Sequence, residues 1–99
     1  MKKCFAFSEL ELPLAAKDAS NALNIELKGY SFSAEIEELR PARRVRVGLI
    51  QNTIVRPTTD PISVQRDALL AKIGSIIQVA HESGVNIVCM QEAWSEYLF

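Results

Sequence analysis

The stretch VNIVCMQEAW, residues 85–94, is the most informative part of this 99-residue chain. It begins as an apolar run rich in β-branched residues, which is typical of a strand buried on both faces of a parallel sheet. The run stops abruptly at a carboxylate, Glu92. Open α/β sheets place their binding sites and chemistry just beyond the carboxyl ends of such strands. Glu92 is therefore a candidate general base or acid at the mouth of a cleft.

A long helix is expected immediately before this strand, at residues 61–83. Asp60 is a suitable N-cap, Pro61 fits the first helical position, and Gly84 stands where a left-handed glycine commonly ends a helix. Apolar residues recur at helical spacing and predict a buried stripe. The stripe is made of Ile62, Leu69, Ile73, Ile76 and Ala80, widened by Leu70 and Ile77.

A first strand is predicted at residues 45–51, and the second strand at residues 85–91. With the helix between them they form one βαβ unit, which should be right-handed with parallel strands. Gln51 and Asn52 would then lie at the same sheet edge as Glu92. Gly48, inside the first strand, indicates that a neighbouring group approaches closely.

Residues 1–43 have weaker signals and are predicted to form a helical or irregular arm packed on something else. Pro13 starts a candidate helix that continues to residue 23. A second short helix is predicted at residues 33–39, with Ser33 as its N-cap and Pro41 ending it. Residues 44–99 would form a separate, partial α/β domain.

Composition limits the possible functions. A chain of 99 residues with formal net charge −1 is at most one small domain and is a poor general partner for nucleic acid or membrane surfaces. Its two cysteines, Cys4 and Cys89, make no disulfide framework and no zinc spacing with His81, so a reducing, cytoplasmic setting is expected. No segment is long enough to span a membrane.

Several residues have both a functional and a structural interpretation. The four arginines between residues 40 and 46 suit an anion site, but with no interleaved aromatic residues a solvated approach to the strand is favoured. His81 in the last helical turn is best explained by the helix dipole. Cys89 is more typical of a core residue than of a nucleophile, because three residues of extended chain put it on the face opposite Glu92. From residue chemistry alone, Glu92 itself is more often a strand-ending polar residue than a catalytic one.

The strand at 45–52, the long helix and the stretch 84–94 together resemble the start of the carbon–nitrogen hydrolase (nitrilase-like) family, closest to its β-ureidopropionase branch. The arm is similar to that branch's N-terminal extension at residues 10–13 and 27–32. The resemblance covers about residues 10–94. It implies an α-β-β-α sandwich, of which this chain would hold the arm and the first βαβ unit.

The resemblance also implies a Glu-Lys-Cys catalytic set, with Glu92 as general base, no cofactor and no metal. Enzymes of this branch hydrolyse N-carbamoyl-β-alanine and its isobutyrate analogue to a β-amino acid, carbon dioxide and ammonia, and they form homo-oligomers. The family's Lys and Cys have no counterpart here, and Lys72 and Cys89 do not match them. After Trp94 the chain departs from the family pattern, so it looks truncated and is expected to be inactive by itself.

Two other expectations remain open. The isolated chain is expected to fold poorly, or to associate with itself or with a full-length relative, because two-stranded units are rarely stable alone. A non-catalytic role as an assembly partner or modulator of a full-length homologue is the alternative to the enzymatic role.

Overall fold

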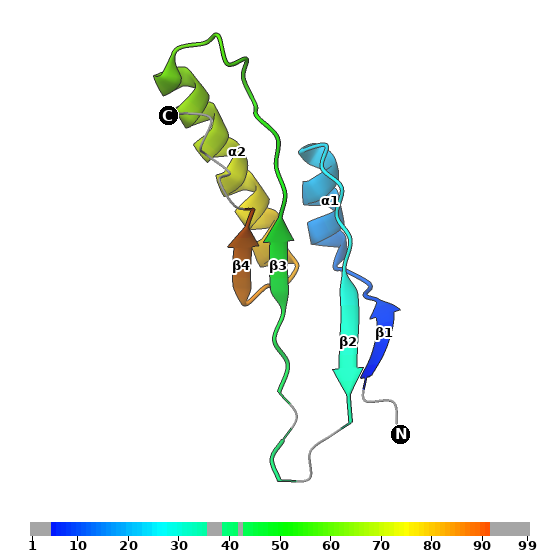
Figure 1. Cartoon of the computed structure of the whole chain (residues 1–99). Helices are drawn as coiled ribbons and strands as arrows, with labels where there is room; N and C mark the ends of the chain where they lie inside the picture. Colours follow the sequence, from blue (N-terminus) through cyan, green and yellow to red (C-terminus); the bar gives the residue numbers. More distant parts are fainter. Residues whose placement is uncertain (1–4, 36–38, 42, 92–99) are drawn as a thin grey trace.

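The structure is a computed structural model that describes residues 5–35, 39–41 and 43–91. Within these residues it has two helices and two separate two-stranded sheets, in the order β1, α1, β2, β3, α2, β4. Figure 1 shows an arm made of β1, α1 and β2 beside a unit made of β3, α2 and β4. The fold is thus mixed α/β, and the four-layer sandwich stays a prediction.

The predicted βαβ unit agrees with the structure. β3 (Val47–Ile50) and β4 (Ile87–Met90) are parallel and in direct register, and α2 (Ile62–Glu82) connects them. Both strands are shorter than the predicted ranges. The packing around Gly48 requires a small residue, as predicted, because an added Cβ would meet both Val85 methyl carbons at 3.1 Å.

The two ends of α2 differ in how well they were predicted. Asp60 is not a side-chain cap: Pro61 is the N-cap residue, and the Asp60 carboxylate pairs instead with Arg56 at 2.8 Å. At the other end Gly84 has φ +77°, its N–H donates to His81, and the Val85 N–H donates to Ala80. These two bonds form a Schellman motif, the helix ending expected for a glycine at this position.

The core is small and lies between α2 and one face of the parallel sheet. Ile50, Leu69 and Ile73 form it, and the half-buried Ile76 packs against them. The buried stripe of α2 is therefore narrower than predicted. Ile62, Leu70 and Ile77 are exposed, because one two-stranded sheet and one short helix cannot cover the whole apolar surface of a long helix.

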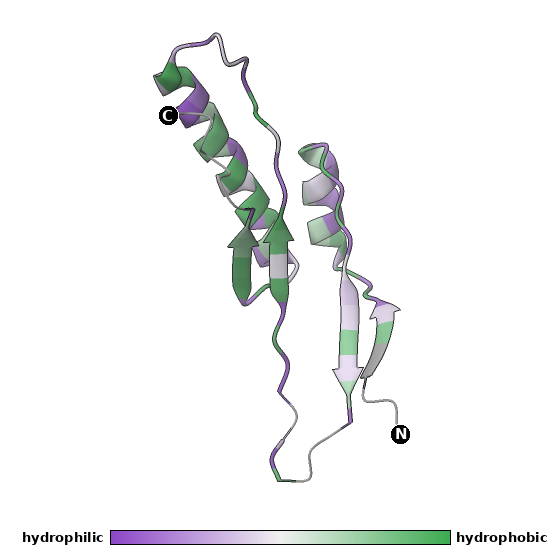
Figure 2. Ribbon diagram, in the orientation of Figure 1, coloured by the Kyte–Doolittle hydropathy of each residue, from purple (hydrophilic) through white to green (hydrophobic). Residues whose placement is uncertain are grey.

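The prediction that the strands are buried on both faces is wrong for this structure. Val47 and Leu49 of β3 lie opposite Ile87 and Cys89 of β4, and this outer face is uncovered, with Leu49 82% exposed. Nothing among the described residues packs there, since α2 covers only the opposite face. Figure 2 shows how apolar both strands are along their length. Cys89 is consequently exposed rather than part of the core.

The arm contains an antiparallel sheet that the sequence analysis missed. β1 (Phe5–Glu9) pairs with β2 (Tyr30–Ala34) in direct register. The predicted helix at 33–39 is thus wrong in its first two residues, Ser33 included; residues 36–38 lie outside the described part. Phe7 stacks on Tyr30 with ring centroids 5.2 Å apart and contacts Phe32 at 5.0 Å, and such cross-strand aromatic contacts favour the strand over a helix.

Between its strands the arm carries α1 (Leu14–Ala22), which begins after Pro13 as predicted and packs against α2. The Lys72 ammonium of α2 donates to the carbonyl of Leu23 at 3.0 Å and holds the two parts together. The molecule is nevertheless elongated, with a radius of gyration of 17.4 Å. A compact chain of this length would have about 13 Å.

The accessible surface area also shows that the chain is less compact than a monomer of its size. It is 7983 Å², whereas a compact monomer of this mass exposes about 5,600 Å². Large apolar side chains such as Leu49 and Phe32 are among those that are exposed. Exposed apolar surface of this kind is typical of surfaces that contact other protein.

Gly74 within α2 and Gly84 just after its C-cap should respond oppositely to alanine. Gly84→Ala forces a side chain into the left-handed region and should cost roughly 1–2 kcal/mol. Gly74→Ala adds a methyl group within the helix where no atom lies within 4 Å, and should stabilise by about 0.5–1 kcal/mol. Far-ultraviolet circular dichroism of the chain should show less helix for the first variant and more for the second. Equal responses would contradict the structure at this helix end.

Candidate functional site

The predicted site lies at the carboxyl edge of the β3–β4 sheet. Glu92 itself is outside the described residues, so its side chain is not placed. The chain is described as far as Gln91, the residue directly after β4, and Gln91 is half-buried. Because β3 and β4 are parallel, Gln51 and Asn52 leave the sheet at this same edge, as predicted.

Gln91 and Asn52 are joined by their polar groups. The Gln91 backbone N–H donates to the Ile50 carbonyl at 3.2 Å and closes the regular ladder. The Gln91 side chain makes two further bonds to β3's continuation. Its amide nitrogen donates to the Asn52 carbonyl at 3.1 Å, and its amide oxygen accepts from the Asn52 N–H at 3.4 Å. The carboxyl edge is thus held by a side chain from one strand bound to the backbone of the other.

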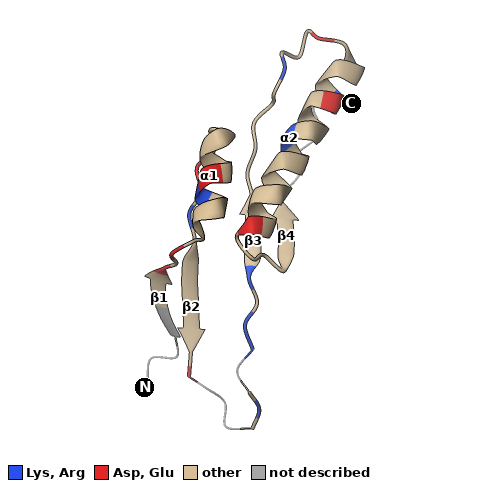
Figure 3. Cartoon of the chain, turned by 180° about the vertical axis from the view of Figure 1, so that it is seen from behind, with Lys and Arg blue, Asp and Glu red and all other residues tan. Residues whose placement is uncertain are grey.

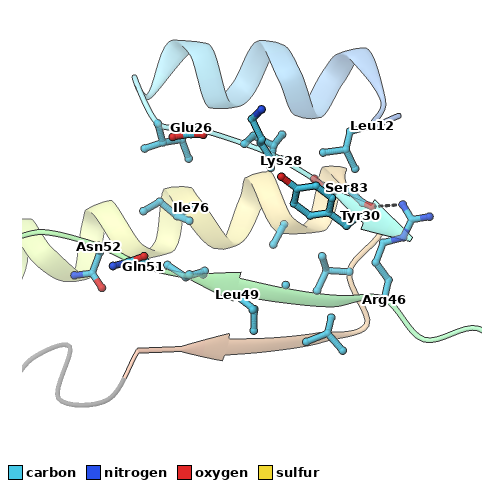
Figure 4. A pocket seen from close by; sticks show the side chains of 18 of the residues that line it. Leu12, Glu26, Lys28, Tyr30, Arg46, Leu49, Gln51, Asn52, Ile76 and Ser83 are labelled. Carbon is cyan, nitrogen blue, oxygen red and sulfur yellow. Dashed lines mark hydrogen bonds between the residues drawn. The ribbon is translucent and has the colours of Figure 1, made fainter. Parts of the chain in front are cut away.

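The opposite, amino edge of the sheet is held by Arg46. Its backbone N–H donates to the Asn86 side-chain oxygen at 2.9 Å, and its carbonyl accepts from Asn86 and Ile87. Its guanidinium donates to the Ser83 carbonyl at 2.6 Å, at the C-terminus of α2 (Figure 4). A cation at this helix end satisfies a carbonyl that has no helical partner and also meets the negative end of the dipole.

A cavity of about 990 Å³ lies between the arm and the βαβ unit. Its lining includes residues 24–30 of the arm, residues 46–55 around β3, and Ile76 of α2. Figure 4 shows the Tyr30 ring between α1 and β3. Gln51 and Asn52, at the carboxyl end of β3, are also among its lining residues.

The structure also places the other residues that the sequence analysis considered as functional candidates. Cys89 is exposed on the outer face of the sheet, and His81 is exposed in the last turn of α2. Figure 3 shows, in blue, the basic residues along the segment that leads into β3. Arg43 and Arg44 are exposed there, whereas Arg46 is bound to Ser83.

Searches of the described part of the chain for two other kinds of site gave negative results. It holds no group of three or more His, Cys, Asp or Glu side chains suited to a metal ion. None of its helices has both the length and the apolar character that crossing a membrane requires.

Sequence reasoning missed the bonds at both sheet edges. In the sequence, Gln91 and Arg46 are polar residues at the ends of predicted strands. That position was the only signal of a role in holding the sheet edges. Their partners lie 39 and 37 residues away, Asn52 for Gln91 and Ser83 for Arg46, so no local pattern could have identified them.

Comparison with known proteins relates the chain to a class of enzymes. No family model matches the chain. The chain is similar, however, to a curated hydrolase. That relative is the β-ureidopropionase of Arabidopsis thaliana, which is 46% identical over 90 residues, or 91% of this chain. The predicted resemblance is therefore confirmed, and a relationship to this hydrolase family is supported. The chain spans 22% of the relative's length.

Proposed function

We propose that this chain is the N-terminal part of a β-ureidopropionase-type amidohydrolase and that Glu92 is its general base. The observation that carries the proposal is the 46% identity to a β-ureidopropionase over 91% of the chain. The geometry supports it, because β4 and its last ladder bond lead directly to residue 92 at the carboxyl edge of a parallel sheet.

The proposed substrate is N-carbamoyl-β-alanine or its isobutyrate analogue. Glu92 accepts the proton of a cysteine thiol, and the thiolate attacks the ureido carbonyl carbon. A lysine stabilises the oxyanion of the tetrahedral intermediate. Collapse of this intermediate breaks a carbon–nitrogen bond, the departing amine takes the proton held by Glu92, and a thioester of the cysteine remains. Glu92 later activates the water that releases the enzyme, and the products are the β-amino acid, carbon dioxide and ammonia. That cysteine and lysine come from outside these 99 residues.

The exposed apolar surfaces support a site in which this chain supplies the base and other parts of the enzyme supply the cysteine and the lysine. The outer face of the β3–β4 sheet is apolar and uncovered, as a sheet that packs inside a larger sandwich requires. The site would then form only when the rest of the enzyme covers this face and supplies the remaining catalytic groups. The 99-residue chain alone should therefore have no ureidopropionase activity.

A chimera tests the proposal. In it, this chain through Trp94 replaces the segment of the Arabidopsis β-ureidopropionase to which it aligns. The chimera should release ammonia from N-carbamoyl-β-alanine, and the purified 99-residue chain should release none above a buffer control. Hydrolysis by the chain alone would refute the requirement for the remaining parts.

A second candidate function is association with a full-length homologous subunit without catalysis. The uncovered face with Val47, Leu49 and Ile87, together with the elongated shape, favours it. An incomplete subunit of this kind would compete for the surfaces on which complete subunits assemble. Co-expression with the Arabidopsis enzyme, followed by size-exclusion chromatography, should reveal a mixed species. Strict separation of the two chains would dismiss this role.

A further inference from the structure

We infer that the groove between β2 and residues 43–46 binds an extended acidic peptide, which adds to the free edge of β2 as a third strand of the β1–β2 sheet. Strand addition of this kind is a common mode of peptide recognition, in which backbone bonds give affinity and side chains give specificity. The proposed binding does not depend on the catalytic role of Glu92, because it uses the arm and the approach to β3 rather than the carboxyl edge of the parallel sheet.

The register of the arm sheet shows which backbone groups of β2 are available. The Leu10 N–H donates to the Gly29 carbonyl at 2.8 Å, and these two residues continue the register of the β1–β2 ladder. Bonded and non-bonded pairs alternate along an antiparallel ladder, so the β2 residues that bond to β1 are Ser31 and Ser33. The residues whose N–H and carbonyl groups face the free edge are therefore Tyr30, Phe32 and Ala34.

This free edge borders a groove of about 910 Å³, and residues 43–46 line the same groove. Figure 1 shows β2 beside the segment that leads into β3. Among the described residues β2 has β1 as its only strand partner. Exposed edges are commonly protected by a charged residue or a proline, and β2, with the sequence YSFSA, has neither. An open and uncharged edge of this kind is suited to pairing with another strand.

The charge of the groove indicates the kind of peptide. Arg43 and Arg44 are exposed, and neither forms a hydrogen bond or ion pair with another described residue. Arg46 already binds the end of α2, and Arg40 and Glu35 have interactions of their own. The two available guanidinium groups favour carboxylates in the occupant. A second copy of β2 is a poorer occupant, because it would bring the same arginines of two chains together.

The aromatic rings of β2 indicate a second property of the peptide. Tyr30 and Phe32 are 49% and 69% exposed, line the groove and contact Phe7 on one face of the sheet. Because Phe7 already covers part of both rings, and because the free edge has the spacing of a peptide backbone, a peptide is favoured over stacked nucleic-acid bases. Apolar residues that alternate with acidic ones would place their side chains on this aromatic face.

The test follows the fluorescence anisotropy of a short labelled peptide, in which glutamate alternates with valine, as the purified 99-residue chain is added. The peptide should bind, and the same peptide with lysine in place of glutamate should not. Arg43→Gln and Arg44→Gln should each weaken binding about fivefold, the upper range for an exposed ion pair. Arg66→Gln is the matched control, because Arg66 is exposed on α2 and pairs with Asp67. The control should bind as the unmodified chain does.

Backbone methylation distinguishes strand addition from simple charge attraction. In an added strand, alternate peptide N–H groups face β2 and the others face away from it. N-methylation of one alternate set should prevent binding, and N-methylation of the other set should have a much smaller effect. Equal effects of the two sets, no binding of the unmodified peptide, or tighter binding of a labelled single-stranded oligothymidine would overturn the inference. None of these results affects the proposed function, which is tested by ammonia release from the chimera.

Discussion

Glu92→Gln in the chimera is expected to reduce kcat roughly 10²- to 10⁴-fold, the range that a general base contributes. Glutamine keeps the size and most of the hydrogen-bonding capacity of glutamate but cannot accept a proton from a thiol. Steady-state ammonia release measures the effect, and the melting temperature of the chimera should stay unchanged because the substitution keeps the size of the side chain.

Glu82→Gln provides the matched control for this charge removal. Glu82 lies in the last turn of α2, where its carboxylate accepts a hydrogen bond from Gln78, and it precedes the amino end of β4 whereas the proposed site follows the carboxyl end. The control should behave as the unmodified chimera does. If Glu92→Gln also retains activity, Glu92 is not the base and the mechanism proposed above is wrong.

Leu69→Ala should have the largest effect on stability, about 2–5 kcal/mol. Leu69 is 1% exposed and is the only large side chain that is fully buried among the described residues. It packs in the small core with Ile50 and Ile73, so its removal leaves a cavity that few neighbours can fill. The thermal unfolding midpoint of the chimera measures the loss.

The neighbouring residue gives a direct comparison. Leu70 is 52% exposed, and Leu70→Ala removes the same atoms from the same helix with little burial to lose. In the 99-residue chain, in which Leu70 is exposed, this variant should lose less helical circular dichroism than Leu69→Ala does. If the two variants lost equal stability, the orientation of α2 on the sheet would differ from the one described here.

The sequence predicted the βαβ unit well because its signals are local. Helical periodicity and the Gly84 ending define α2, and two apolar runs define the parallel strands. The arm was predicted less well. The acids after Ser33 suggested a helix start, but Phe32 pairs with Phe7 across a sheet, and that partner is 25 residues away along the chain.

Burial was the least predictable property. Residues such as Leu49 and Cys89 have the composition of a strand covered on both faces, and their exposure follows from which other elements are present. In the candidate site, too, local sequence indicated one residue, and a contact between distant residues was not predictable. Glu92 was identified from its position after an apolar run and lies outside the described residues, whereas the link between Gln91 and Asn52 emerged only from the structure.

Ammonia release from N-carbamoyl-β-alanine by the chimera is the most direct test of the central claim, that this chain forms the general-base part of a β-ureidopropionase-type enzyme. Turnover comparable to that of the parent Arabidopsis enzyme is expected, and Glu92→Gln should abolish it. A folded chimera of the parent's size that releases no ammonia would contradict it.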